Sequence, residues 1–185
     1  MNQITMETSR LLLRPWEDAD AGALYKYASD PLVGPAAGWQ PHRSEAESLT
    51  IIRTVLSEPE TYAVVLKESG EPVGSIGLMT PRTQSGDTSA SMELGYWLAR
   101  PLWGQGLIPE AAAALLERAF TALNCTKLYC AYFEGNSKSA RVGEKCGFVY
   151  DHTEQVLWTP LEKTLTEHFT LLTRERWLER QSRCG

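Results

Sequence analysis

Residues 96–110 constrain the fold of this chain more than any other segment; they read Tyr-Trp-Leu-Ala-Arg-Pro-Leu-Trp-Gly-Gln-Gly-Leu-Ile-Pro-Glu. An apolar strand ends in a glycine turn, and an alanine-rich helix begins immediately afterwards. Such a turn exposes backbone N–H groups beside the positive end of a helix dipole, which favours a bound anion. The segment therefore predicts a strand–turn–helix unit that is suited to hold phosphate.

Neither of the two common nucleotide-binding motifs fits this turn. A Walker A loop requires Gly-Lys-Ser/Thr, and no such lysine follows Gly106. The dinucleotide-binding fingerprint requires a further glycine three residues after Gly106, where Pro109 stands. Because a Gly-x-Gly pair also occurs in plain strand-to-helix turns, the turn alone does not identify a ligand.

Hydrophobic periodicity and turn residues divide the whole chain into strands and helices. Strands are expected at 9–16, 62–66, 73–79, 91–98, 127–133, from 148 onward and at 167–173, and helices at 17–29, 44–57, 106–123 and 137–146. Ser44 and Glu47 have the spacing of a capping box, whereas residues 30–43 and 81–88 are expected to be loops and the C-terminus a polar tail. This order predicts one domain over residues 1–185, of the α+β or mixed α/β class, with helices on both faces of the sheet.

Composition narrows the class of protein. The chain has 185 residues and a formal net charge of −5, which argues against a nucleic-acid partner. Four cysteines, at positions 125, 130, 146 and 184, lack C-x-x-C spacing, so we expect no metal site and no disulfide framework but reduced thiols in the cytoplasm. The sequence shows neither a signal peptide nor an apolar run of membrane-spanning length, so no membrane partner is expected.

Several segments together resemble the GNAT superfamily of acyl-CoA-dependent N-acyltransferases, and in particular its RimJ/RimL-like branch, which acetylates protein N-termini and related amines. They read Thr8-Ser-Arg-Leu-Leu-Leu-Arg-Pro15, Met92-Glu-Leu-Gly-Tyr-Trp-Leu98 with Trp103-Gly-Gln-Gly-Leu107, and Asn136-Ser-Lys-Ser139 with Glu144-Lys-Cys-Gly-Phe148. The resemblance implies a GNAT-like fold, in which a splayed, mostly antiparallel sheet of about seven strands carries helices on both faces. One departure is Pro101, which stands where the family's loop often has Gln or Arg.

The resemblance also implies acetyl-CoA as co-substrate, no metal, and a set of cofactor-binding residues. Tyr96, Trp97 and Leu98 would pair with the pantetheine arm through their backbone groups, and one N–H there would polarise the thioester. The pyrophosphate would be held by Trp103, Gly104, Gln105, Gly106 and Leu107, and the second cofactor segment contributes Asn136 and Ser139. Lys138, Arg141 and Lys145 are expected to form a solvated face of the same helix, and contact of some of them with the nucleotide 3′-phosphate is the alternative.

Amine acylation needs a base for the amine and a proton donor for the departing thiolate. Glu93 shares a strand face with Gly95 and Trp97, which would desolvate its carboxylate partly, so we expect it to be the general base, directly or through a water. Ser139 is the expected donor to the thiolate. The alternatives are a solvated strand carboxylate for Glu93 and a helix-cap hydroxyl for Ser139.

The acceptor is expected to lie against Trp39, Tyr132 and Glu134, with Tyr25, His42 and Phe133 as further contributors; ordinary packing is the alternative for each. His168 is expected to be structural. The leading hypothesis is transfer of acetyl from acetyl-CoA to a primary amine, on a protein N-terminus or a small molecule, by direct attack in a ternary complex. A non-catalytic acyl-CoA-binding or scaffold domain is the alternative, and the protein is expected to be a monomer or a homodimer.

Overall fold

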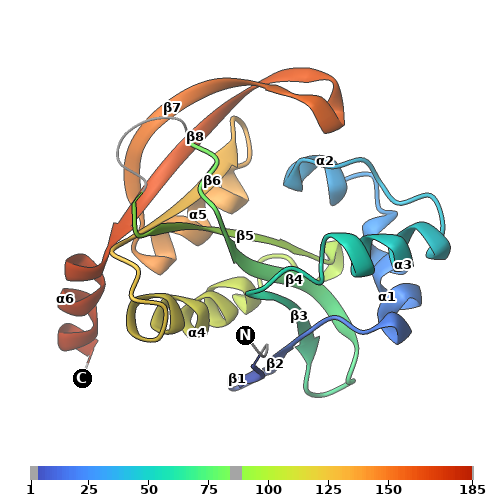
Figure 1. The fold of residues 1–185 in the computed structure, drawn as a ribbon, viewed down its shortest axis with the longest axis horizontal. Coiled ribbons are helices and arrows are strands. Elements are labelled where there is room, and N and C mark those ends of the chain that lie inside the picture. The colour runs from blue at the N-terminus through green and yellow to red at the C-terminus, as the bar shows by residue number, and fades with distance from the viewer. Residues whose placement is uncertain (1–3, 84–88, 185) are drawn as a thin grey trace.

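A computed structural model describes residues 4–83 and 89–184, and these form one sheet with helices on both faces (Figure 1). The sheet has eight strands in the order β1-β2-β3-β4-β5-β6-β8-β7. The strands are β1 Met6–Glu7, β2 Leu11–Arg14, β3 Thr61–Leu66, β4 Pro72–Met79, β5 Ser91–Leu98, β6 Lys127–Phe133, β7 Val149–Trp158 and β8 Lys163–Thr173. All neighbouring strands are antiparallel except β5 and β6, which are parallel.

The helices are α1 Ala21–Ala28, α2 Gly34–Ala37, α3 Glu45–Thr54, α4 Leu107–Thr121, α5 Ser137–Cys146 and α6 Arg174–Cys184. Short 3-10 turns occur at Asp18–Asp20, Arg100–Leu102 and Thr159–Leu161. Figure 1 shows α4, α5 and α6 near one end of the sheet and α1, α2 and α3 near the other, with the long β7–β8 hairpin arching over the top.

The alternation of side chains along β3 separates two hydrophobic clusters. Tyr62 and Val64 point into the larger cluster, which is covered by the buried stripe of α4. Ala63 and Val65 point into the smaller cluster, which is covered by α1 and α3. Because successive strand residues face opposite sides of a sheet, one apolar strand fills two cores, and the predicted coverage of both faces is confirmed.

Elements with strong local signals have the predicted bounds. The strands β5 and β6 and the helix α5 begin and end where the sequence places them. Ser44 caps α3 by accepting the N–H of Glu47 at 3.1 Å, but the Glu47 carboxylate accepts the N–H of Arg43 instead, at 2.6 Å. The reciprocal half of the expected capping box is therefore absent.

Three elements were not predicted: the two-residue strand β1, the single turn α2 inside the expected loop 30–43, and the helix α6 in the expected polar tail. α6 depends on a distant contact, because Trp177 packs on Phe120 of α4 with ring centroids 5.4 Å apart. Of the expected loop 81–88, residues 84–88 lie outside the described residues.

Candidate active site

The strands β5 and β6 separate soon after they meet. Their parallel pairing joins residues 91–93 to residues 127–129, although β5 continues to Leu98 and β6 to Phe133. Beyond Glu93 the facing edges of the two strands are therefore not hydrogen-bonded to each other. This splay leaves strand edges that can pair with an extended ligand, as in β-strand addition.

Only part of the β5 backbone faces the splay. The N–H of Ala99 donates to the C=O of Val73, which precedes Gly74 in β4, at 2.8 Å. Because alternate residues of an antiparallel ladder direct their backbone groups to opposite sides, Trp97 also faces β4, whereas Tyr96 and Leu98 face the splay. Tyr96 and Leu98 thus lie as the sequence analysis expects, but Trp97 offers its indole ring rather than its backbone.

The turn before α4 presents unpaired amides. Gly104 and Gly106 have φ of +81° and +77°, in the left-handed region that favours glycine, and Gly106 is the N-cap of α4. In the described part of the chain, no backbone carbonyl accepts the amides of residues 104–107. The amide of Trp103 is different, because it donates to Arg100 C=O at 3.2 Å. Four consecutive amides at a helix N-terminus fit a phosphate group, and Trp103 is not one of them.

The indole ring of Trp103 instead connects the glycine turn to β5 and to α5. Its Nε1 donates to the C=O of Leu98 at 2.8 Å, and the Lys138 ammonium lies 4.2 Å from its ring centroid. Lys138, expected on a solvated face, thus joins the turn to α5 by a cation–π contact.

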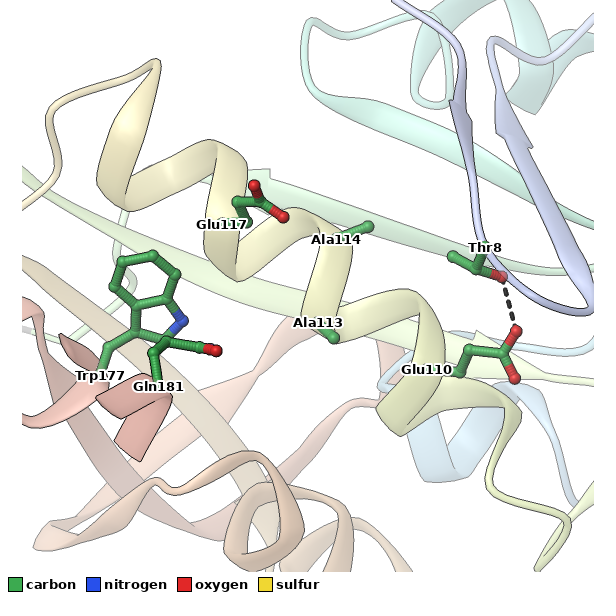
Figure 2. A pocket seen from close by; sticks show the side chains of 7 residues that line it. All are labelled: Thr8, Glu110, Ala113, Ala114, Glu117, Trp177 and Gln181. Carbon is green, nitrogen blue, oxygen red and sulfur yellow. Dashed lines mark hydrogen bonds between the residues drawn. The ribbon is translucent and has the colours of Figure 1, made fainter. Parts of the chain in front are cut away.

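The segment between β1 and β2 braces this turn. Glu110, in the first turn of α4, accepts the Thr8 hydroxyl at 2.6 Å (Figure 2). It also accepts the Arg10 N–H at 2.7 Å and the Arg10 Nε at 2.7 Å. Arg10 Nη1 also donates to Gln105 C=O at 3.1 Å. Thr8 and Arg10 therefore fix the backbone of the glycine turn and the first turn of α4.

A pocket of about 510 Å³ lies beside these contacts, on the outer flank of α4. Figure 2 shows the side chains that line it. It is lined by Thr8, Glu110, Ala113, Ala114, Glu117, Trp177 and Gln181. None of these residues was predicted to bind substrate, and the pocket lies on the opposite flank of α4 from its buried stripe.

Glu93 is buried in an ion pair at the inner end of the splay. Its side chain is 1% exposed, and its two oxygens accept the Arg82 backbone N–H at 2.8 Å, Nε at 2.8 Å and a third bond from Nη2. The same Nη2 lies 2.8 Å from Oε1 of Glu167, which is 2% exposed. One guanidinium thus serves two buried carboxylates, and burial raises the pKa of Glu167 although Arg82 opposes that shift.

Ser139 lies at the start of α5, opposite β5. Its N–H donates to Oδ1 of Asn136, the N-cap, at 3.2 Å, and its Oγ lies 2.7 Å from the Tyr96 hydroxyl. Asn136 Nδ2 donates to Ala36 C=O of α2 at 3.3 Å. Asn136 is therefore a helix cap, and Ser139 is joined across the splay to a side chain that the sequence analysis assigned only a backbone role.

Aromatic rings form the wall on the Glu93 side. Trp39 meets Trp97 edge-on with centroids 5.9 Å apart, and Phe133 meets Trp158 with centroids 5.1 Å apart. Trp158 also donates its Nε1 to Gly38 C=O, and the Arg82 guanidinium lies 4.8 Å from its ring. The tip of the β7–β8 hairpin is thereby held against the segment after α2, as Figure 1 shows.

The other residues that were predicted to line the amine-acceptor site do not all lie on the same side of the sheet. Tyr132 pairs with His168 at 5.1 Å and alternates with Phe133, so it faces the opposite side of the sheet from Trp39. Glu134 is exposed in the turn after β6. His42 packs on Trp39, and its Nδ1 lies 2.8 Å from Oγ of Ser48. Burial lowers the pKa of the His42 imidazole. The structure thus brings Trp39, but neither Tyr132 nor Glu134, to the Glu93 side.

Sequence reasoning missed Arg82, Glu167 and Trp158. Arg82 begins a loop, Glu167 opens the predicted last strand, and Trp158 closes β7, so they lie far apart in the chain. An isolated arginine or glutamate carries no local pattern. The one available signal is Glu167 itself, a charged residue in a strand that is otherwise rich in apolar and β-branched residues.

Comparisons with known proteins identify the class to which this site belongs. The family described as "Acetyltransferase (GNAT) domain" matches residues 10–149. "Uncharacterized N-acetyltransferase p20" of Bacillus licheniformis is 29% identical over 149 residues, which cover 78% of this chain and 82% of that protein. The chain belongs to the GNAT acetyltransferase family.

Solved structures confirm the fold. The acetyltransferase (GNAT family) from Bacillus anthracis superposes with a TM-score of 0.79 at 20% identity, over 93% of this chain and 99% of the other. The ribosomal-protein-S5-alanine acetyltransferase from Vibrio fischeri superposes with a TM-score of 0.68 at 19% identity, over 95% and 99%. The GNAT fold is therefore as the sequence predicts.

Membership of the family makes this chain an enzyme of the GNAT type, with acyl-CoA-dependent N-acetyltransferase activity. GNAT acetyltransferases use acetyl-CoA and act on amine acceptors. Residues 4–83 and 89–184 contain no group of three or more His, Cys, Asp or Glu that could hold a metal ion. Over the same residues, no helix is both long and apolar enough to cross a membrane.

Proposed function

We propose that this enzyme transfers the acetyl group of acetyl-CoA to a primary amine by direct attack in a ternary complex. The observation that carries the proposal is the splay of β5 from β6 next to the glycine turn. The unpaired amides of residues 104–107 would hold the pyrophosphate, and Tyr96 and Leu98 would bond the pantetheine arm. A backbone N–H of β5 facing the splay would stabilise the thioester oxygen as it gains charge.

The cysteines support direct attack rather than an acyl-enzyme. Cys130, which lies in β6 beside the splay, is 2% exposed, and burial raises the pKa of its thiol to about 12. Burial also raises the pKa of Cys146 to about 11. Because the thiolate is the nucleophilic form, both groups are poor nucleophiles at neutral pH.

Glu93 is the proposed proton acceptor for the attacking amine. A carboxylate oxygen can accept about two hydrogen bonds. Arg82 supplies two bonds to Oε1 and one to Oε2, so Oε2 keeps a position for a water that links it to the amine. Ser139 is the proposed hydrogen-bond donor to the departing thiolate. The three hydrogen bonds from Arg82 fix the position of the Glu93 carboxylate.

The acceptor that fits this side of the sheet is a cation that can lose a proton. Glu93 and Glu167 share the guanidinium of Arg82, so two carboxyl groups meet one cation beside Trp97 and Trp158. An ammonium group would supply a second cation. A protein N-terminal α-amine and a small-molecule amine both have this chemistry, and Trp39 would line their path. The Vibrio fischeri structural neighbour is named as a ribosomal-protein-S5-alanine acetyltransferase, which supports a protein acceptor.

The proposal is tested by measuring release of free CoA with acetyl-CoA and a panel of peptide and small-molecule amines. Glu93→Gln is expected to lower kcat about 100-fold or more, with the affinity for CoA unchanged, because only proton removal is lost. Glu60→Gln is the matched control: Glu60 is also a buried carboxylate paired with an arginine, Arg118, but on the α4 side of the sheet. Wild-type rates in the Glu93→Gln variant would refute the assignment of the base.

We further propose a cytoplasmic enzyme that acts as a monomer or a homodimer, on amine acceptors and not on nucleic acid. The net charge of −5 supports the last point, because nucleic-acid-binding domains usually carry a net positive charge.

A further inference from the structure

The side chain of Tyr96 has a place in the site that the proposed function does not use. Tyr96 comes from β5 and reaches across the splay to the first turn of α5. Its Oη lies 2.7 Å from Oγ of Ser139 and 3.3 Å from the C=O of the same residue. The two hydroxyls therefore form a pair at the point where β5 and α5 approach each other.

We propose that Tyr96 is a positioning residue that directs the Ser139 hydroxyl at the sulfur of the departing thiolate. This inference rests on the proposed acyl transfer. It adds to that proposal the group that decides where the Ser139 proton points.

The direction of the hydrogen bonds follows from the protons available. Burial raises the pKa of Tyr96, so its phenol stays protonated and has one proton to donate. When that proton goes to Ser139 Oγ, the serine proton is free for a third acceptor. When it goes to the Ser139 C=O, the serine proton can turn back to the tyrosine oxygen instead.

Charge that develops on the sulfur selects between these two arrangements. A thioester sulfur is a weak acceptor, whereas a thiolate is a strong one, so the outward serine proton is stabilised most when the C–S bond breaks. A hydroxyl that accepts one hydrogen bond also becomes a better donor in the next. The pair therefore favours the transition state over the ground state, which is the condition for raising kcat.

The surroundings keep this pair fixed and uncharged. Asn136 holds the main chain of Ser139 through its N-cap bond of 3.2 Å. The thiols of Cys130 and Cys146 lie close enough to influence Tyr96, and burial raises the pKa of both, so they are neutral. The neighbours of Tyr96 are therefore uncharged: the Cys130 thiol on β6, and the Ser139 hydroxyl and Cys146 thiol on α5.

The bonds and charges balance without another reagent. The acceptor ammonium first releases one proton to solvent through the water on Glu93. The neutral amine then forms the C–N bond as the C–S bond breaks, and its second proton passes to Glu93, which returns it to water. The electron pair of the C–S bond stays on the sulfur, where the Ser139 hydrogen bond stabilises it until the released thiolate takes a proton from water. Tyr96 ends the reaction with the proton it had at the start.

A double-mutant cycle tests the inference. Ser139→Ala is expected to lower kcat about 100-fold and Tyr96→Phe about 10-fold, with KM for acetyl-CoA nearly unchanged. Because Tyr96 acts through Ser139, Tyr96→Phe is expected to have no further effect in the Ser139→Ala background. Tyr150→Phe is the control, since that exposed hydroxyl bonds Thr153 away from the splay. Wild-type kcat in Tyr96→Phe, or equal losses in both backgrounds, would overturn the inference.

A second measurement needs no acceptor and no turnover. The thiol of bound CoA, followed by its thiolate absorbance, is expected to ionise at lower pH in the wild type than in Tyr96→Phe or Ser139→Ala. The same ionisation pH in all three proteins would also overturn the inference. Failure of the wild type to release CoA with any amine would instead refute the proposed function, so the two failures are distinguishable.

Discussion

Removing the Arg82 guanidinium is expected to destabilise the protein strongly, and in a pH-dependent way. Arg82→Met keeps an unbranched apolar stem but leaves Glu93 and Glu167, which are 1% and 2% exposed, without their shared cation. Breaking a buried ion pair by removing one partner costs about 3–5 kcal/mol. The Arg82 side chain is itself 36% exposed, so solvent screens part of its charge, and we expect about 3 kcal/mol at neutral pH.

The sign of the pH dependence follows from Glu167. Burial already raises its folded-state pKa, and Arg82 is the group that opposes this shift, so the pKa rises further in Arg82→Met. Between the unfolded and folded pKa values of Glu167, the folded variant holds a proton that the unfolded chain has released. Stability therefore falls as pH rises through the folded pKa, and the deficit of the variant shrinks as pH is lowered.

Urea denaturation of wild type and Arg82→Met between about pH 5 and about pH 8 measures both effects. Adding Glu93→Gln and Glu167→Gln to Arg82→Met is the control, because neutral amides remove the unpaired charges and should restore much of the stability. If Arg82→Met stays within about 0.5 kcal/mol of wild type across this range, the buried carboxylates do not depend on Arg82 and the reasoning is refuted.

Two further predictions concern the glycine turn and the thiol in the splay. Gly106→Ala and Gly70→Ala both place a side chain at positive φ, +77° and +69°, so each variant should lose about 1–2 kcal/mol of stability. Calorimetry should show weaker CoA binding only for Gly106→Ala. Equal CoA affinity in the two variants would show that the turn does not hold the pyrophosphate. Cys130→Ala should keep turnover close to wild type, because burial raises the pKa of that thiol to about 12 and so makes it a poor nucleophile. Loss of all turnover in a folded Cys130→Ala variant that still binds CoA would contradict direct attack.

The backbone of the cofactor site is largely a local property of the sequence. The glycine pair, the apolar strand before it and the alanine-rich helix after it define β5, the turn and α4 within a few residues. Asn136 likewise caps α5 three residues before Ser139, and Gly147 ends that helix with φ +95°. Such features depend on propensities and hydrogen bonds between near neighbours, so a sequence pattern can predict them.

Tertiary structure decided which side chains meet. Arg82, Glu93 and Glu167 come from a loop, from β5 and from β8, and only the strand order β5-β6-β8 and the return of the loop onto the sheet bring their charges together. The division of Trp39 from Tyr132 follows from strand parity, and the Tyr96–Ser139 pair from the splay. Contacts between residues this far apart depend on sheet register and helix packing, and neither quantity is encoded in the neighbours of any one residue.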